Sequence, residues 1–348
     1  MKAQVLTGIR QMEMRERSAP QISAPKDVLI RMSCVGVCGS DVHYYTTGRI
    51  GSQVVQYPFA VGHEGAGVVE QVGSEVTRVK PGDRIAIEPA MSCFECDQCR
   101  AGRQHTCRKL RFLGCPGQAE GCLTELLVMP EESCFPIPDS MSLTEAALSE
   151  PLAIGVYAVR QSVPMRGAKV GVLGVGPIGL SVLVAAKAQG AGTIYVTDKL
   201  NDRLRVAVAN GADWGGNATN PDLLDEFQAR EPGQLDVVFE CCGQQHALDQ
   251  AVMMLKPGGK LMVVGIPEED RVWFSIDFLR RKEICIQNVR RQVHCVQPTL
   301  DGIASGSLPV DFMVTHRFAF ERSKEAFDLV ADYRDGVVKA MIDFGGAS

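Results

Sequence analysis

The chain has 348 residues, of which 45% are hydrophobic and 22% charged, and its formal net charge is −5. This length suffices for two domains with large cores, and the mixed charges exclude a basic patch for nucleic acid. No apolar run of about 18 residues predicts a membrane span, and the N-terminus lacks the apolar core of a signal peptide. With 13 cysteines, several in apolar surroundings, we expect a cytoplasmic protein in a reducing compartment.

Up to about Glu150, the chain consists of short apolar runs separated by turns that contain glycine and proline. Val28–Met32, Gly67–Val72 and Arg84–Glu88 are predicted to be strands. The segment Lys80–Asp83, with the sequence KPGD, is predicted to be a turn between the last two. This pattern indicates an irregular β-barrel.

Two glycine-bracketed segments of this region contain residues that bind metals. Cys38 lies in GVCGSD, and His63 and Glu64 lie in GHEGAG. Glu150 stands between an apolar helix and Pro151, so we expect it to be buried. One thiolate, one imidazole and one or two carboxylates form an open catalytic zinc site. Taken one at a time, Cys38 and His63 could equally be buried core residues. Because they occur together, and because the chain also has the nucleotide-binding segment described below, they predict a catalytic metal site.

Four cysteines follow in one short polar stretch, residues 92–108. Cys93, Cys96, Cys99 and Cys107 have the spacing C-x2-C-x2-C-x7-C, which is typical of a structural zinc site with four thiolate ligands. The stretch has few apolar residues, so metal binding would supply its folding energy. Two disulfides or unrelated cysteines are the alternatives, and an iron–sulfur cluster is the rival metal. Nothing else in the sequence indicates an electron-transfer centre.

From about Lys169 to Gln287, apolar strands alternate with helical stretches. This alternation predicts a doubly wound domain with a parallel sheet. The rest of the chain returns to mixed β and loop structure, with a helix near Ser323–Arg334. The predicted strands are Lys169–Leu173, Thr193–Thr197, Leu235–Phe239, Lys260–Val264 and Glu283–Ile286, and the predicted helices are Leu180–Gln189, Asp202–Asn210, Pro221–Arg230 and Gln245–Leu255.

A G-x-G-x-x-G motif, residues 174–179, follows the first of these strands and precedes the first helix. This context is typical of dinucleotide binding: the glycines allow a tight turn, approach of a pyrophosphate and close helix packing. Asp198 ends the second strand, where an acidic residue binds ribose hydroxyls and repels a 2′-phosphate. NAD is therefore predicted over NADP, although Lys199 and Arg203 weaken that repulsion. The alternative is a structural glycine turn with a surface aspartate.

Together these motifs resemble the zinc-dependent medium-chain dehydrogenase/reductase superfamily, and most closely its sorbitol (polyol) dehydrogenase branch. The resemblance covers nearly the whole chain and implies an α/β fold with two domains and an active site in the cleft between them. Residues 1–153 and 291–348 would form a GroES-like β-barrel catalytic domain, which includes the structural zinc lobe 92–108, and residues 154–290 a Rossmann NAD-binding domain. The runs that carry the resemblance are Cys38–Tyr45, Gly48–Gly51, Gly62–Glu64, Pro81–Pro89, Glu150–Leu152, Gly174–Gly179, Glu240–Gly243 and Thr315–Phe318.

The resemblance implies a role for several individual residues. Cys38, His63 and Glu64 would ligate or flank the catalytic zinc, and Glu150 would be the fourth ligand or hold a zinc-bound water; which glutamate binds directly stays open. The other implied roles are as follows: Asp41 orients His63, Ser40 and His43 relay the proton, and Tyr44, Phe112, Glu150, Arg291 and Gln292 contact the substrate.

Gln292 departs from the animal polyol dehydrogenases, which carry a tyrosine there, so the substrate contacts differ in detail. Two zinc ions per subunit and a homotetramer or homodimer are also implied. The residues expected to bind the cofactor are Gly174, Gly176, Pro177, Ile178, Gly179, Asp198, Arg203, Cys241, Val264, Gly265, Ile266, Val289 and Arg290.

The implied reaction transfers a hydride from a secondary hydroxyl of a polyol of the sorbitol, xylitol or L-iditol type to NAD and gives a ketose. Tyr44-Tyr45 and Gly48–Gly51 favour a polyol, because its extended chain needs polar and aromatic contacts. Zinc-dependent threonine, glucose or simple alcohol dehydrogenases are the alternatives. A further alternative is a relative that only binds ligands or has a structural role and does not catalyse a reaction. The joint presence of five candidate catalytic residues argues against it: Cys38, Ser40, His63, Glu64 and Glu150.

Overall fold

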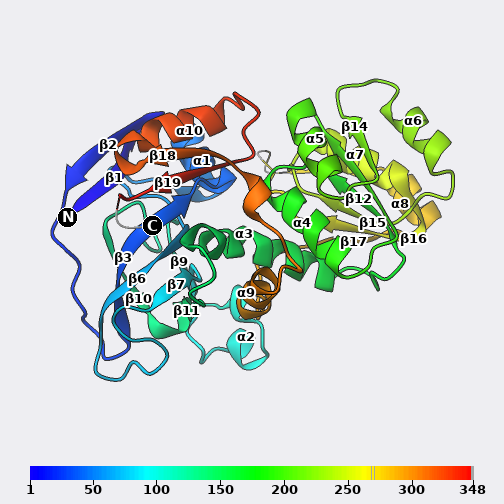
Figure 1. Cartoon of the computed structure of the whole chain (residues 1–348). Coiled ribbons are helices and arrows are strands. Elements are labelled where there is room, and N and C mark those ends of the chain that lie inside the picture. Colours follow the sequence, from blue (N-terminus) through cyan, green and yellow to red (C-terminus); the bar gives the residue numbers. More distant parts are fainter. Residues whose placement is uncertain (268, 270, 346–348) are drawn as a thin grey trace. The chain divides into compact units, whose positions relative to one another are not determined.

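The computed structural model describes residues 1–267, 269 and 271–345, and it divides into two compact units (Figure 1). Unit 1 consists of Met1–Glu150, Val296–Gly306 and Met313–Ser348, and unit 2 of Pro151–Cys295 and Ser307–Phe312. The first junction lies within helix α3 (Leu143–Arg160), beside Pro151. The bounds of these units are close to the domain ranges expected from the sequence. The assignment of one domain to catalysis and the other to NAD binding stays a prediction.

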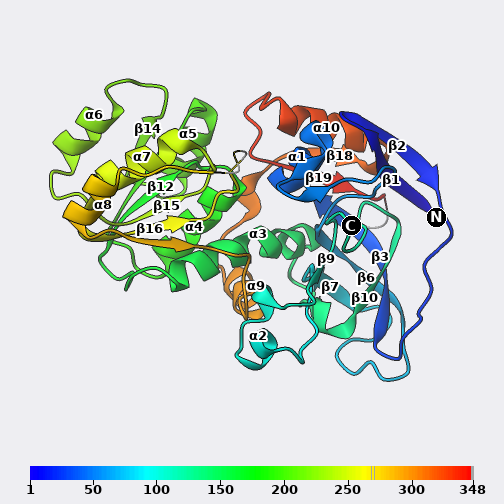
Figure 2. The ribbon, with the colours of Figure 1, turned by 180° about the vertical axis from the view of Figure 1, so that it is seen from behind.

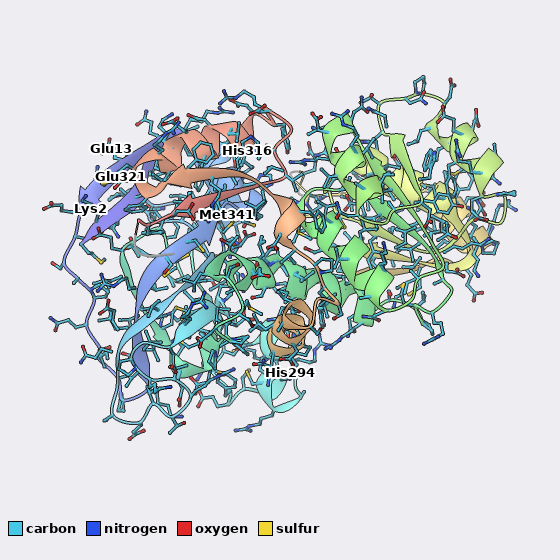
Figure 3. All side chains as sticks on the ribbon, in the orientation of Figure 1. Lys2, Glu13, His294, His316, Glu321 and Met341 are labelled. Atoms are coloured by element: carbon cyan, nitrogen blue, oxygen red, sulfur yellow. The ribbon has the colours of Figure 1, made fainter. Side chains whose placement is uncertain are left out.

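A seven-stranded sheet forms the core of unit 1, with the order β11-β7-β6-β3-β19-β18 and with β10 also paired to β3. Along the first part of β3, buried residues such as Ile30 alternate with more exposed ones, as expected for a half-buried strand. His316 on β18 and Met341 on β19, labelled in Figure 3, mark the C-terminal pair of strands. The strands are β3 (Asp27–Gly36), β6 (Glu64–Val72), β7 (Arg84–Ile87), β10 (Leu126–Pro130), β11 (Cys134–Pro136), β18 (Val314–Ala319) and β19 (Lys339–Asp343).

The register of this sheet fixes the positions that matter below. Gly36 at the end of β3 pairs with Glu64 on β6 and with Met341 on β19. The N- and C-terminal parts of the chain therefore meet at one residue of the central strand. The other elements of unit 1 are β1 (Lys2–Gly8), β2 (Gln11–Glu16), β4 (Arg49–Ile50), β5 (Gln53–Val54), β8 (Ala90–Met91), β9 (Arg111–Phe112), α1 (Gly39–Thr47), α2 (Asp97–Arg100), α9 (Val296–Ala304), α10 (Ser323–Ala331) and the short 3-10 helices η1 (Gln104–Thr106), η2 (Glu131–Ser133) and η4 (Phe320–Arg322). The 3-10 helix η3 (Asp311–Met313) spans the boundary between the two units.

Unit 2 is a six-stranded parallel sheet with the order β14-β13-β12-β15-β16-β17. Figures 1 and 2 view this sheet from opposite sides and show helices on both of its faces. This is the strand order of the doubly wound dinucleotide-binding fold, in which the order reverses between β12 and β15. The elements are β12 (Lys169–Leu173), β13 (Thr193–Asp198), β14 (Trp214–Asn217), β15 (Leu235–Glu240), β16 (Leu255–Val263) and β17 (Cys285–Asn288), with α4 (Pro177–Ala188), α5 (Asn201–Ala209), α6 (Leu223–Arg230), α7 (Gln245–Met254) and α8 (Ile276–Lys282).

The predicted α/β fold class is confirmed, and a few elements differ from the prediction. Helix α8 was not among the predicted helices: Arg280–Lys282 form its end, and Asp277 pairs with Arg281 one turn later. Strand β14 was missed because its sequence, WGGN, has no apolar run. In the part of the chain that the structure describes, no helix has the length and apolar character needed to span a membrane.

Candidate active site and metal centres

Cys38, His63 and Glu64 come together in unit 1. Cys38 is the residue before α1, His63 is the residue before β6, and Glu64 is the first residue of β6. One ligand atom from each of the three lies within 4.8 Å of the others. His63 and Glu64 are 5% and 1% exposed, while Cys38 is partly exposed. A thiolate, an imidazole nitrogen and a carboxylate oxygen at this spacing fit a zinc ion with an accessible side.

Asp41 lies behind His63, as the resemblance implied. His63 Nδ1 is 3.3 Å from Asp41 Oδ2, and the backbone N–H of Gly62 donates to Asp41 Oδ1 (3.1 Å). The other ring nitrogen, Nε2, is therefore left for a metal. Burial lowers the pKa of His63, but the negative charges of Asp41 and Cys38 outweigh burial and place this pKa well above its ordinary value. Metal binding must displace that proton.

Glu64 has a partner that the sequence analysis missed. Lys339 Nζ lies 2.5 Å from Glu64 Oε2 and also donates to the carbonyl oxygen of Val37 (3.1 Å). Both side chains of the pair are at most 2% exposed. Burial lowers the pKa of Lys339, yet the charges of Glu64 and Cys38 raise it above its ordinary value. A lysine within the apolar run VVKAMI was the signal, because a buried cation needs a buried anion.

Gly36 lets this pair form across the central strand. A Cβ atom at Gly36 would lie 2.3 Å from Glu64 Oε2, so the carboxylate would have to move from its present position. Since β3 separates β6 from β19, the missing side chain opens the path between Glu64 and Lys339. Gly36 thus allows close approach between the strands and the buried pair.

Glu150, the other predicted carboxylate, is 8% exposed and lies in α3. It is not one of the three residues whose ligand atoms lie within 4.8 Å of one another. Its charge still helps to raise the pKa of Lys339, so it lies in the same electrostatic environment. Which glutamate binds a metal directly stays a prediction.

Ser40 and His43, the predicted proton relay, both lie on α1. Ser40 Oγ donates to Cys38 Sγ at 3.4 Å, so this hydroxyl is next to the ligand group. His43 follows three residues later and is partly exposed; residues three apart on a helix share a face. The relay itself stays a prediction.

Two predicted substrate residues, Tyr44 and Phe112, belong to unit 1, and Phe112 lies beside the ligand His63. The Phe112 ring is 5.3 Å from the His63 ring. The Tyr44 hydroxyl donates to Gln53 Oε1 (3.2 Å) and lies 3.7 Å from Cys115 Sγ. Gln53 and Cys115 are neighbours that the sequence analysis did not single out.

Arg291 and Gln292, the other predicted substrate residues, belong to unit 2. Arg291 has a φ of 51°, which is unusual for a residue with a side chain. Gln292 Oε1 accepts a hydrogen bond from the backbone N–H of Cys295 (2.9 Å). Their roles toward substrate stay a prediction.

The four cysteines of segment 92–108 form a second group of ligands. Their sulfur atoms all lie within 4.8 Å of one another, and three of the separations are 3.4, 3.9 and 4.0 Å. Tetrahedral zinc–thiolate bonds of about 2.3 Å require sulfur separations of about 3.8 Å, whereas a disulfide requires about 2.05 Å. The group is Cys93, Cys96, Cys99 and Cys107.

Backbone N–H groups in and beside segment 92–108 donate to the cysteine sulfur atoms and thereby stabilise negative charge on them. Those of Cys93 and Lys109 donate to Cys107 Sγ at 3.3 and 3.4 Å. Backbone donation from Arg108 and Cys99 lowers the pKa of Cys96 to about 6. These contacts favour the thiolate form of Cys96 and Cys107, which is the form that binds zinc, whereas burial raises the pKa of Cys99 to about 12. These residues therefore fit a structural zinc site.

The glycine motif of unit 2 has the geometry that a dinucleotide site requires. Gly174 has a φ of 87° and donates its N–H to the carbonyl oxygen of Thr197 (2.8 Å). A Cβ at Gly179 would lie 1.9 Å from the Gly174 oxygen, so only glycine allows α4 to begin here. The free N–H groups at the start of α4 form a site for phosphate.

Asp198 and Arg203 lie beside this turn. Asp198 Oδ2 accepts from the N–H of Val175 (2.8 Å), and Oδ1 accepts from that of Leu200 (2.9 Å). A Cβ at Gly176 would lie 3.3 Å from Arg203 Nη1. Asp198, which is expected to bind ribose, and Arg203, which is expected to weaken the repulsion of a 2′-phosphate, thus lie beside the same turn.

The other predicted cofactor residues lie along the same edge of the sheet. The N–H of Cys241 donates to Leu173, and that of Val289 donates to Val263, at 2.8 and 2.9 Å. Val264, Gly265 and Ile266 follow β16 directly, and Arg290 follows β17. The carboxyl edge of a parallel sheet is where doubly wound folds bind ligands.

Comparison with known proteins shows the family to which this chain belongs. Residues 24–139 match the alcohol dehydrogenase GroES-like domain, and residues 177–305 match the zinc-binding dehydrogenase family. Sorbitol dehydrogenase of Bacillus subtilis is 36% identical over 98% of this chain and 97% of its own length, and L-idonate 5-dehydrogenase of Vitis vinifera is 36% identical over 94% and 90%. A solved Escherichia coli oxidoreductase of unknown specificity superposes with a TM-score of 0.93 at 32% identity and covers 99% of each chain.

The chain therefore belongs to the zinc-dependent medium-chain dehydrogenase/reductases, in the branch that contains the sorbitol dehydrogenases. Membership of this family makes the protein an oxidoreductase that uses zinc and a nicotinamide cofactor. The predicted GroES-like and Rossmann folds are confirmed by the same matches.

Proposed function

We propose that this protein oxidises a secondary hydroxyl of a polyol of the sorbitol, xylitol or L-iditol type to a ketone and reduces NAD. The observation that carries the proposal is the presence in one chain of two prepared sites. One is the ligand group Cys38, His63 and Glu64, and the other is the glycine turn with Asp198 beside it. The similarity to a sorbitol dehydrogenase over almost the whole chain supports the choice of substrate.

The proposal assigns one zinc ion to each ligand group. Cys38, His63 and one of the two carboxylates, Glu64 or Glu150, would hold the catalytic ion, and the four cysteines of segment 92–108 would hold the structural one. When bound, the catalytic zinc and NAD supply Lewis-acid polarisation of the hydroxyl and a hydride acceptor.

The chain's own residues prepare the metal site. Asp41 fixes the tautomer and orientation of His63. Lys339 binds Oε2 of Glu64 and leaves Oε1 available. The lysine also offsets part of the negative charge of the ligand group, which would otherwise repel an alkoxide. Lys339 thus supports the same reaction without touching substrate.

The proton of the substrate hydroxyl leaves through groups on α1 in this proposal. Ser40 Oγ is adjacent to Cys38, so it accepts the proton next to the ligand group. The partly exposed imidazole of His43 then passes it to solvent. Tyr44, Phe112, Arg291 and Gln292 would contact the polyol.

Asp198 supports NAD as the cofactor, because its carboxylate at the glycine turn repels a 2′-phosphate. Arg203 lies beside the same turn, and its positive charge limits the preference for NAD over NADP. We propose a homotetramer or homodimer in the cytoplasm. The 13 free cysteines support a reducing compartment, because disulfides among the ligand cysteines would compete with metal binding.

A substrate panel tests the function. NADH absorbance is followed with sorbitol, xylitol, L-iditol, L-idonate, L-threonine, glucose and 2-propanol, each with NAD and with NADP. We expect the highest kcat/KM for one of the three polyols with NAD. A higher value for L-threonine, glucose or 2-propanol would refute the substrate class, and one for L-idonate would assign a sugar acid, as in the Vitis relative. A Cys38→Ser variant controls for contaminating activity.

A further inference from the structure

Glu240 is a buried carboxylate at the carboxyl edge of the sheet in unit 2. It is the last residue of β15 and is 0% exposed. Its Oε1 accepts from the N–H groups of Cys242 (2.8 Å) and Gly243 (2.6 Å). Its backbone oxygen accepts from those of Val264 (2.8 Å) and Gly265 (2.9 Å). One residue therefore holds the loops that follow two adjacent strands.

These loops, residues 241–243 and 264–266, touch each other without side chains between them. A Cβ at Gly243 would lie 2.3 Å from the Ile266 oxygen, and one at Gly265 would lie 2.3 Å from the Gly243 nitrogen. The same Cβ at Gly265 would lie 2.8 Å from Glu240 Oε2. The carboxylate thus fills the space beneath the point where the backbones meet.

The second oxygen of Glu240 argues against a role in stability alone. Oε2 is buried and accepts no hydrogen bond from any residue that the structure describes. A buried acceptor without a donor is unfavourable for folding. An apolar side chain of the same size would avoid this cost, but it would not hold the N–H groups of Cys242 and Gly243.

The loops lie where the cofactor is expected. A Cβ at Gly174 would lie 2.7 Å from Cys242 Cβ, so the first loop packs against the first glycine of the phosphate-binding turn. Ile266 in the second loop is 50% exposed. Strands β12 and β15, which precede the turn and the first loop, flank the reversal of strand order where doubly wound sheets bind dinucleotides.

We propose that Glu240 is a positioning residue for the dinucleotide: it fixes both loops so that their backbone and exposed side chains match the bound cofactor. Because its side chain is inaccessible, it acts through the loops and does not touch the cofactor. The inference rests on the proposed binding of NAD by unit 2.

Glu231 provides a matched control within the same unit. It is also buried (7% exposed), and it accepts from Lys169 Nζ (2.7 Å) and the Tyr195 hydroxyl (3.1 Å). It lies at the amino edge of the sheet, because Lys169 begins β12. Loss of either carboxylate disturbs a buried polar contact, but only Glu240 contacts the loops at the cofactor edge.

The test compares Glu240→Gln, Glu240→Ala and Glu231→Gln in the full chain. NADH affinity is measured by fluorescence titration, thermal unfolding without cofactor monitors the fold, and KM is measured for NAD and for the polyol. We expect Glu240→Ala to weaken NADH binding by about tenfold or more and to raise KM for NAD without raising KM for the polyol. Glu240→Gln, which keeps one acceptor, should recover part of the affinity.

Glu231→Gln should lower the unfolding temperature and leave the NADH affinity within about twofold of the wild type. Equal loss of NADH affinity in Glu231→Gln and Glu240→Gln, or wild-type affinity in both Glu240 variants, would overturn the inference. A Glu240→Ala chain that does not fold leaves the decision to the glutamine variant. Failure of the wild type to bind NADH would instead overturn the proposed function, and this inference with it.

Discussion

Lys339 Nζ lies 2.5 Å from Glu64 Oε2, and both side chains are almost completely buried beside the predicted ligands Cys38 and His63. The two residues are distant in sequence, and the glycine at position 36 gives them room to meet. A buried ion pair stabilises a fold weakly in itself, but removal of one partner leaves an uncompensated charge. The metal site and the C-terminal strand of unit 1 are therefore coupled.

Lys339→Met should destabilise the protein strongly. Removing one partner of a buried pair costs about 3–5 kcal/mol, because Glu64 is left without its cation. Chemical denaturation measures the free energy of unfolding. Lys324→Met, which breaks the more exposed pair between Lys324 and Asp328, should cost less than about 1 kcal/mol. Equal losses in the two variants would contradict the coupling.

Asp41→Asn should weaken zinc binding at the site of Cys38 and His63. The amide does not stabilise the imidazole N–H as the carboxylate does, and loss of such a partner lowers metal affinity by about 10- to 100-fold. Competition with a chromophoric chelator measures the affinity. The variant should still bind the zinc of the cysteine lobe, which makes that ion an internal reference. Unchanged affinity would show that Asp41 does not support the ligand.

Cys96→Ser should lower the zinc content from two ions per chain to one. Cys96 belongs to the four-thiolate group, and a structural zinc supplies folding energy to a segment with few apolar residues. Metal analysis of the purified protein gives the stoichiometry, and limited proteolysis reports cleavage within 92–108. Cys285→Ser, which alters an exposed cysteine outside both groups, is the control. Two ions in the Cys96 variant would contradict the assignment.

Asp198→Asn should shift the cofactor preference toward NADP. The amide keeps an acceptor near the N–H groups of Val175 and Leu200 but removes the charge that repels a 2′-phosphate. We expect the ratio of kcat/KM for NADP to that for NAD to rise by about tenfold. Steady-state kinetics with both cofactors checks this. A ratio equal to that of the wild type would show that Asp198 does not select the cofactor.

Glu131 should make the stability of unit 1 sensitive to acid. Donation from the N–H of Thr77, together with Lys26 and the N–H of Arg78, lowers the pKa of Glu131 to about 2. The ionised carboxylate stabilises the fold fully above its unfolded pKa of about 4.3, and this contribution is lost as the pH falls toward 2. Because Lys26 is half exposed, solvent screens the pair, and we expect a loss of about 1 kcal/mol.

Denaturant unfolding of the wild type and of Glu131→Gln checks this pH dependence. The wild type should be more stable at pH 7, and the two curves should converge between pH 4.5 and 2. A difference that stays constant over that range would show that the charge of Glu131 does not contribute.

Local patterns in the sequence predicted most of the parallel sheet, because its strands are apolar runs that begin and end at turns. Lys169–Leu173 matches β12, and the glycine motif lies between β12 and α4 as predicted. Strand β14 was missed because it is short and has two glycines, and helix α8 because it buries none of its residues. Helices and strands without an apolar pattern form because they pack against, or pair with, neighbouring elements of the fold.

The ligand groups were predicted because cysteine, histidine and glutamate side chains at that spacing are typical of metal binding. Lys339 and Gln53 were missed because their roles depend on contacts with residues of other elements, Glu64 on β6 and Tyr44 on α1. The contact between Lys339 and Glu64 needs the pairing of β19 and β6 with β3, which no local pattern encodes. Glu240 was noticed only as part of a motif, since its burial and its two loop contacts are properties of the folded sheet.

The most direct test of the account is the zinc dependence of polyol oxidation. NADH formation from sorbitol or xylitol is measured for the isolated protein, after removal of zinc with a chelator, and after zinc is added back. The account predicts activity that is lost with the metal, returns with it, and is absent in Cys38→Ser at any zinc concentration. Polyol-dependent NADH formation that persists in the zinc-free protein or in Cys38→Ser would contradict the central claim.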